Sequence, residues 1–169
     1  IESIVLNNNA KLIYEDVKVH VGKEKEKAIR RALGSPTEAA LLVLAEKAGF
    51  IPYDLRMKYS IIVEFSFNSS IKRMTTVYKT NNNIEETFVY TKGAPENVIS
   101  LCSEIQINES IRKFDEDQKN QILEIIEQRA YQGYRTLAVA YKRIKGYNNE
   151  KREIIEDSLV FLGFLSILD

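Results

Sequence analysis

Three strand-like segments in the middle of the chain follow one another too closely to be joined by helices. They cover residues 60–65, 72–79 and 86–91, and the two links contain the turn-prone runs Asn68-Ser-Ser70 and Asn81-Asn-Asn83. Parallel neighbours would need a crossover of about a dozen residues or more, whereas antiparallel neighbours need only a turn. The sequence therefore predicts an antiparallel meander.

Two longer helices are expected to pack against this sheet, which gives an α+β fold: an antiparallel β-sheet flanked by helices. In Ser35-Pro-Thr-Glu38, the serine, proline and glutamate occupy the positions of a capping box, and Gly49 ends that helix. Residues 115–132 carry isoleucines at spacings of three and four before Gly133. Other strands are expected at 3–6, 11–14, 17–21, 104–107, 135–141 and 159–165, other helices at 95–102 and 149–157, and a short helix or an excursion at 23–31.

The composition indicates one ordinary globular domain covering residues 1–169. Lys plus Arg and Asp plus Glu both number 24, so no overall charge directs the chain to nucleic acid or to an anionic membrane. No apolar run approaches the ~18 residues that span a bilayer. The first ten residues also lack the basic and apolar regions of a secretory signal.

Cys102 is the only cysteine and His20 the only histidine. A disulfide within the chain is therefore impossible, and neither a Cys/His metal site nor a histidine-based catalytic triad is expected. We expect Cys102 to be a buried thiol and His20 to lie on the surface. This usage suggests a reducing, cytosolic setting.

The segment Lys92-Gly-Ala-Pro-Glu96 ends one predicted strand and begins a helix. Pro95 suits the first helical turn because its fixed φ and missing N–H cost nothing there. A lysine and helix amides would then face the same place, which suits a phosphate. The alternative is a solvent-facing lysine before an ordinary helix. Since neither G-x-x-x-x-G-K-[ST] nor G-x-G-x-x-G occurs, any nucleotide site must combine separate elements.

Three other places offer groups for such a site. Glu38 could accept a hydrogen bond from an exocyclic amine, or it could serve only the capping box. Lys72 follows a polar turn and could close over a base or reach a phosphate. Arg135 could hold phosphate oxygens bidentately, or it could be an ordinary arginine beside the carboxyl end of a helix.

Phe67 stands at the end of a predicted strand, beside the polar turn. Strict alternation would put it on one face with Ile61, Val63 and Phe65, and both phenylalanines would then belong to the core. Alternatively, Phe67 presents its ring to a base, where stacking is worth about 1–3 kcal/mol.

These motifs occur together in one order: Gly34-Ser-Pro-Thr-Glu38, Phe67-Asn-Ser-Ser-Ile-Lys72, Lys92-Gly-Ala-Pro-Glu96 with Cys102 six residues on, and Arg135-Thr-Leu-Ala-Val-Ala140. From about Gly34 to the C-terminus, the chain resembles the nucleotide-binding (N) domain of a type II P-type cation-transporting ATPase. Residues 1–33 fit this family only in position and general character.

The resemblance implies an antiparallel sheet flanked by helices, and it assigns roles to six residues of a nucleotide site. It implies no metal site and no catalytic residue in this domain. Phe67 would stack on adenine, Glu38 would meet the adenine edge, Lys72 would line the base and phosphate path, Lys92 with Gly93 would line the pocket floor, and Arg135 would contact the phosphate chain.

Two positions depart from the family pattern. Ser35 stands where the family often has an acidic residue, and Ser69 stands where calcium-pump relatives carry an arginine. A metal-linked role at Ser35 and one phosphate contact at Ser69 are therefore not expected. The Phe67–Met74 segment leans toward fungal and protist sodium or calcium pumps.

The resemblance implies an ATP-binding domain that positions ATP for phosphoryl transfer to an aspartate in a separate phosphorylation domain. The chain lacks the Asp-Lys-Thr-Gly-Thr motif, so we expect an excised, monomeric cytoplasmic domain of a membrane pump that does not hydrolyse ATP alone. Mg²⁺ would act in the parent, and the phosphorylation and actuator domains would be its partners. The rival hypotheses are a stand-alone adenine-nucleotide sensor and a structural domain without a ligand.

Overall fold

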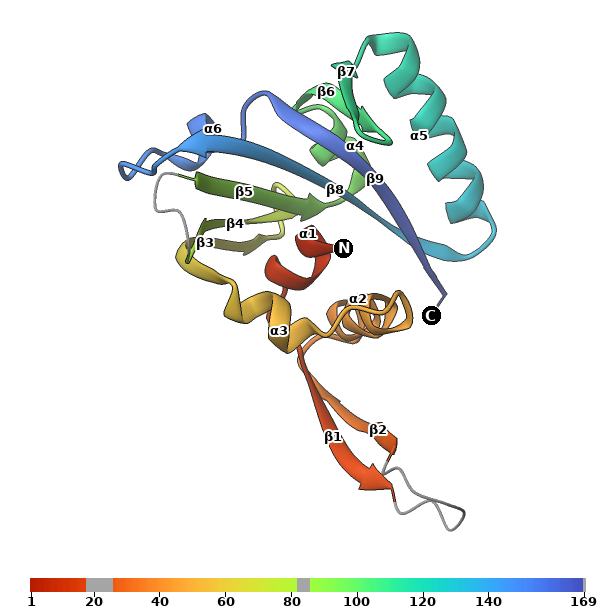
Figure 1. Cartoon of the computed structure of the whole chain (residues 1–169). Helices are drawn as coiled ribbons and strands as arrows, with labels where there is room; N and C mark the ends of the chain where they lie inside the picture. Colours follow the sequence, from red (N-terminus) through yellow and green to blue (C-terminus); the bar gives the residue numbers. More distant parts are fainter. Residues whose placement is uncertain (18–25, 82–85, 169) are drawn as a thin grey trace.

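The structure is a computed structural model that describes residues 1–17, 26–81 and 86–168 (Figure 1). The predicted surface position of His20 lies outside the described residues. The predictions for residues 17–21 and 23–31, and the turn at Asn81-Asn-Asn83, lie partly outside them.

A seven-stranded sheet forms the centre of the molecule, and the predicted meander is its first part. Strands β3, β4 and β5 are successive antiparallel neighbours. The pair β6–β9 is parallel, so the sheet is mixed, whereas we expected it to be antiparallel throughout. The chain between these two strands contains two helices and two further strands, so it is long enough for a crossover. In spatial order the strands are β3 (Tyr59–Asn68), β4 (Arg73–Thr80), β5 (Glu86–Gly93), β8 (Tyr134–Lys145), β9 (Leu159–Leu168), β6 (Cys102–Ile107) and β7 (Ser110–Lys113).

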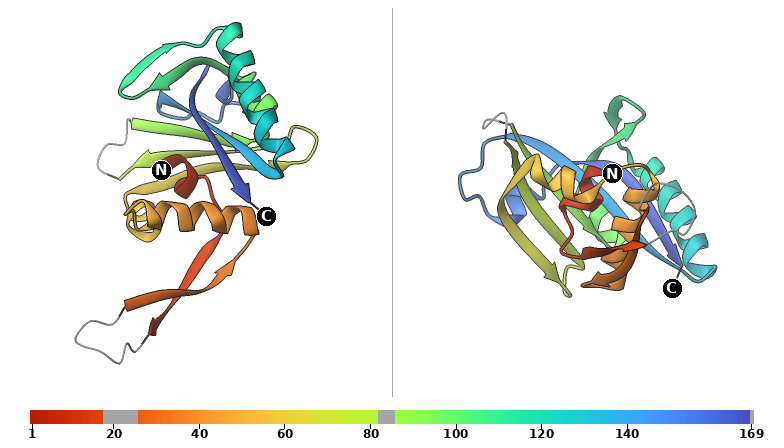
Figure 2. Two further views of the ribbon diagram at one scale, coloured as in Figure 1. Left: turned by 90° about the vertical axis from the view of Figure 1, so that its right-hand side faces the viewer. Right: turned by 60° about the horizontal axis from the view of Figure 1, so that its bottom comes forward.

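Helices cover both faces of this sheet, which confirms the α+β class (Figures 1 and 2). Alternate residues of β8 divide between two hydrophobic clusters: Val139 packs with α1, α2 and α3, whereas Ala138 and Ala140 pack with α4 and α5. Ile155 of α6 joins a third cluster with Val77 and Val89 of the sheet. The helices are α1 (Glu2–Leu6), α2 (Pro36–Lys47), α3 (Pro52–Met57), α4 (Pro95–Ile99), α5 (Glu116–Tyr131) and α6 (Arg152–Ile155).

A hairpin of β1 (Lys11–Val17) and β2 (Glu26–Leu33) extends away from the sheet (Figure 2). The described part of residues 23–31 thus belongs to a strand of this projecting hairpin, so the helix alternative is wrong there and the excursion is the better description. Among the described residues, no helix combines the length and the apolar character that a membrane crossing requires.

One local prediction near the N-terminus is wrong, and one helix was not predicted. Residues 3–6 were expected as a strand but lie in α1, where Ile4, Val5 and Leu6 are buried. A short apolar run does not by its pattern distinguish a strand from a buried helical turn. The helix α3 had no sequence prediction at all.

The predicted capping box of α2 is also wrong. Ser35 has the extended backbone of an N-cap, but its side chain makes no capping hydrogen bond, and Glu38 is bound elsewhere. A capping box does begin α5: the Gln118 amide donates to Asp115 Oδ1 over 2.9 Å, and the Asp115 amide donates to Gln118 Oε1 over 3.2 Å. These bonds satisfy two amides that lack partners within the helix.

Cys102 is 2% exposed, which confirms the predicted buried thiol. Its S–H donates to the Val98 carbonyl over 3.2 Å, and burial raises the pKa of the thiol to about 12.

Candidate functional site

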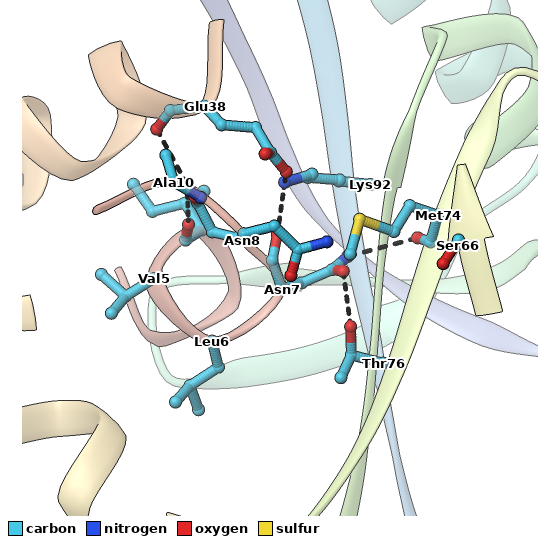
Figure 3. A network of polar contacts seen from close by, with 12 residues as sticks. Val5, Leu6, Asn7, Asn8, Ala10, Glu38, Ser66, Met74, Thr76 and Lys92 are labelled. Carbon is cyan, nitrogen blue, oxygen red and sulfur yellow. Dashed lines mark hydrogen bonds and ion pairs between the residues drawn. The ribbon is translucent and has the colours of Figure 1, made fainter. Parts of the chain in front are cut away.

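An ion pair joins the first turn of α2 to the end of β5 (Figure 3). Lys92 Nζ lies 2.6 Å from Glu38 Oε1, although 54 residues separate the two in sequence, and it also donates to the Asn7 carbonyl. The side chains of Lys92 and Glu38 are 7% and 17% exposed. The solvent-facing lysine considered as an alternative is therefore wrong.

Two opposing influences act on the Lys92 ammonium. Burial disfavours its charged form, whereas the hydrogen bond and the negative charge of Glu38 favour it. Burial is the larger effect, so the pKa of Lys92 is lowered. Glu38 thus partly offsets the desolvation cost of burying the Lys92 ammonium beside the end of α1.

The N-terminal segment forms one wall around this pair. Asn7 is buried, its amide nitrogen donates to the Met74 carbonyl over 3.2 Å, and its side-chain oxygen accepts from Thr76 over 2.8 Å. Asn8 Nδ2 donates to the Glu38 carbonyl over 2.9 Å (Figure 3). These bonds hold α1 against both α2 and the sheet, and they place the Asn7 carbonyl beside Lys92.

Arg56 of α3 strengthens that wall. Its guanidinium donates to the carbonyls of Val5, Asn8 and Ala10, with distances from 2.7 to 3.4 Å. Sequence reasoning found neither this arginine nor Asn7. The only signal was the asparagine run at 7–9 after an apolar segment, which resembles ordinary loop composition.

Gly93 lets the turn between β3 and β4 approach the end of β5. A Cβ atom at this position would lie 2.4 Å from the Lys72 carbonyl oxygen and 2.7 Å from Arg73 Cα. The next amide, of Ala94, donates to that Lys72 carbonyl over 2.9 Å. Because the neighbours are backbone atoms, a side chain at Gly93 would push the turn away.

Phe67 and Lys72 stand at the two ends of this turn. Phe67 is 62% exposed, so the alternative that places it in the core is wrong, whereas Val63 and Phe65 do pack against the third cluster. The pairing of β3 with β4 is irregular between Phe65 and Asn68, which interrupts strict alternation. Lys72 has φ 46° and its ammonium lies 3.9 Å from Glu96.

Arg135 reaches the same helix as Glu38 from the start of β8. Its Nη1 donates to the Thr37 hydroxyl over 2.8 Å, one residue before Glu38. Direct contacts therefore join Glu38 to Lys92 and Gly93 to Lys72. Arg135 connects to this group through Thr37, and Phe67 connects to it through the β3–β4 turn.

The whole chain, residues 1–169, matches the family described as P-type ATPase, cytoplasmic domain N. A calcium-transporting ATPase of Bacillus subtilis is 35% identical over 136 residues, which are 80% of this chain and 15% of the relative. A probable cation-transporting P-type ATPase of Mycoplasma genitalium is 34% identical over 139 residues, which cover 80% and 14%. A sodium/potassium exporting P-type ATPase of Schizosaccharomyces pombe is 32% identical over 139 residues, which cover 80% and 13%. The chain thus spans a small part of each relative, and it belongs to the P-type ATPase cytoplasmic domain N family.

Proposed function

We propose that this chain is the ATP-binding domain of a P-type cation-transporting ATPase. In this role it positions ATP for phosphoryl transfer to an aspartate in a separate phosphorylation domain. The observation that carries the proposal is the largely buried Glu38–Lys92 pair, which lies next to the turn that bears Phe67 and Lys72. Membership of the family supports the nature of the parent.

The donors and acceptors of the pair suit both parts of a nucleotide. The Lys92 ammonium has three N–H donors. Two of them bind the Asn7 carbonyl and the Glu38 carboxylate, and a phosphate oxygen is proposed to accept the third. A carboxylate has several lone pairs, so Glu38 can accept from an adenine amine while it holds Lys92.

Three further side chains complete the proposed site. The exposed ring of Phe67 is proposed to stack on adenine, and Lys72 to line the path from base to phosphates. Arg135 carries a guanidinium, which suits bidentate binding of phosphate oxygens.

This assignment makes the domain a positioning device. Positioning is the main contribution that a protein makes to phosphoryl transfer. In the parent, Mg²⁺ accompanies ATP, and the phosphorylation and actuator domains are the proposed partners of this monomeric cytoplasmic unit. The chain alone is proposed to bind ATP weakly, with little dependence on metal, and not to hydrolyse it.

The first test compares two substitutions in one turn, Phe67→Ala and Ser69→Ala. Removal of the ring takes away base stacking, so we expect Phe67→Ala to weaken ATP binding by roughly fivefold or more, whereas Ser69→Ala has little effect. Titrations followed by amide chemical shifts give both affinities and also report on folding. Equal affinity for ATP in the wild type and in Phe67→Ala would refute the stacking role.

The rival sensor hypothesis uses the same residues, so titration does not separate it from a pump domain. The sequence of the complete gene does: an acceptor aspartate before this segment and a Thr-Gly-Asp hinge after it identify the pump. If no amide near Phe67 or Lys92 shifts with nucleotide, the ligand-free structural domain is the better description.

A further inference from the structure

Glu156, at the end of α6, is a fully buried carboxylate that the candidate site does not use. Arg152 Nε donates to its Oε1 over 2.7 Å, and Arg73 Nε donates to its Oε2 over 2.7 Å. The Thr75 hydroxyl also donates to Oε1. Both carboxylate oxygens are therefore satisfied, which a charge at this depth requires.

Arg152 also binds the backbone on both sides of the β3–β4 turn. Its Nη2 donates to the Arg73 carbonyl over 2.9 Å, and its Nη1 donates to the Ser66 carbonyl over 3.3 Å. Ser66 precedes Phe67, and Arg73 follows Lys72. One guanidinium thus spans the two ends of the segment that carries the proposed adenine-stacking ring.

The same guanidinium lies 5.8 Å from the centroid of the Phe65 ring, at a distance typical of a cation–π contact. Glu156 keeps it in place, because Arg152 is 15% exposed and its Nε is bound to the carboxylate. The planar fork of an arginine is needed here, since a lysine offers a single point of charge.

The turn has reason to depend on such an anchor. Phe67 is mostly exposed and the strand pairing beside it is irregular, so its own packing does little to fix the ring. A second anchor is the bond from the Ala94 amide to the Lys72 carbonyl. The two anchors hold the turn from different elements, α6 and the segment after β5.

We propose that Arg152, held by Glu156, is a positioning residue for nucleotide binding: it fixes the Ser66–Arg73 turn so that Phe67 is preorganised for the base. The inference rests on the proposed ATP-binding function and deepens it. Preorganisation lowers the cost of ordering a site when its ligand binds.

The test compares Arg152→Ala with Arg143→Ala. Arg152→Ala keeps Glu156 paired with Arg73, whereas Arg143 is an exposed arginine of β8 that pairs with Glu86 at the other end of β5. We expect Arg152→Ala to weaken binding of ATP and of adenosine by the same factor, roughly fivefold, and to speed hydrogen exchange at the Ala94 amide. Arg143→Ala should change neither quantity.

A double-mutant cycle separates positioning from general damage. If Arg152 acts through the ring, Arg152→Ala costs no further affinity when Phe67 is already alanine. An independent loss in that background, or wild-type affinity in the single variant, overturns the proposal. A larger loss for ATP than for adenosine also overturns it, because Arg152 would then act on the phosphates.

Arg152→Lys provides the same comparisons if the alanine variant does not fold. It keeps the charge but cannot bridge two carbonyls in the same way, so we expect little recovery of affinity. Recovery to the wild-type value would show that charge alone matters and would overturn the proposal. Absence of ATP binding by the wild-type chain itself would instead be a failure of the proposed function, and the inference would fall with it.

Discussion

Two buried ion pairs lie on opposite faces of the same strands. On the face covered by α1 and α2, Lys92 of β5 binds Glu38. Thr76 of the neighbouring strand β4 binds Asn7 on the same face. On the other face, Thr75 and Thr91, each one residue away in sequence, share a hydrogen bond of 2.8 Å, and Thr75 donates to Glu156. Alternation along β4 and β5 thus separates two polar clusters by a single residue.

The two clusters differ in how far water can reach them. Glu38 keeps 17% of its side chain exposed, whereas Glu156 has none exposed and is bound by two arginines and a hydroxyl. A carboxylate that is partly exposed, like Glu38, can bind water or a ligand when its contact with the lysine is lost. A fully buried carboxylate, like Glu156, cannot, so its role is structural. We infer that the partly exposed Glu38–Lys92 pair (the open pair) serves binding and that the fully buried Glu156 cluster (the sealed pair) supports the geometry of the open pair.

The largest expected effect is therefore at the sealed pair. Glu156→Gln leaves Arg73 and Arg152 without a counter-charge, and we expect the free energy of unfolding to fall by roughly 3–5 kcal/mol. Urea denaturation measures this change, and Glu153→Gln, an exposed position in the same helix, is the matched control. A loss no greater than that of the control would show that the arginines are adequately solvated and that the cluster is not sealed.

The second largest effect is expected at Gly93, which follows Lys92 of one cluster and packs against Arg73 of the other. Gly93→Ala introduces a Cβ that overlaps the backbone of Lys72 and Arg73, so we expect a loss of roughly 1–3 kcal/mol in the free energy of unfolding. The displaced turn should also weaken ATP binding. Urea denaturation and nucleotide titration measure the two quantities, with Ser69→Ala as the control. A variant with wild-type values for both would mean that the turn shifts without consequence.

The fold was predictable where local rules and tertiary structure agree. Short polar links predicted the β3–β4–β5 meander, and the isoleucine spacing before Gly133 predicted α5, although its capping box was not predicted. At α2 the helix was correct but the capping box was not, because Glu38 binds a lysine 54 residues away. A distant buried cation outcompeted a local backbone amide.

The candidate site was predictable only where side chains carry the chemistry. Glu38, Lys92 and Gly93 stand in recognisable motifs, and the structure brings the first two into contact. Asn7 accepts a hydrogen bond from Lys92 through its backbone carbonyl, and no pattern of side chains in the sequence predicts such a contact. Glu156 lies in a charged segment that is typical of an exposed helix, and only its two arginine partners explain its burial.

The third prediction concerns the open pair and has a pH signature. Lys92→Met removes the donor to Glu38 and Asn7, and we expect a loss of about 1 kcal/mol in the free energy of unfolding near pH 7. Burial lowers the pKa of Lys92 in the folded chain from the ordinary 10.5, so the unfolded chain binds more protons between the two values. The free energy of unfolding of the wild type, relative to that of Lys92→Met, should therefore increase as the pH rises toward 10.5.

Urea denaturation of both proteins at several pH values measures this difference. Parallel stability curves would mean that Lys92 titrates alike in the folded and unfolded chains. Substitutions of Lys92 also test its role in binding. Both Lys92→Met and Lys92→Ala should weaken ATP binding by roughly tenfold and adenosine binding by less. An equal loss for both ligands would move Lys92 away from the phosphates.

The smallest expected effect on stability is at a third ion pair, which is fully open. Lys72 and Glu96 are 60% and 61% exposed and 3.9 Å apart, so Glu96→Gln should change the free energy of unfolding by less than about 0.5 kcal/mol. The substitution also removes a competitor for the Lys72 ammonium, so ATP affinity at low salt should hold or rise slightly, with Glu104→Gln as the control. A clear fall in ATP affinity would contradict this, because it would mean that Glu96 holds Lys72 in its binding position. Retained affinity would instead extend the contrast between the clusters: the more exposed a lysine–carboxylate pair is, the less it costs to exchange the carboxylate for a phosphate.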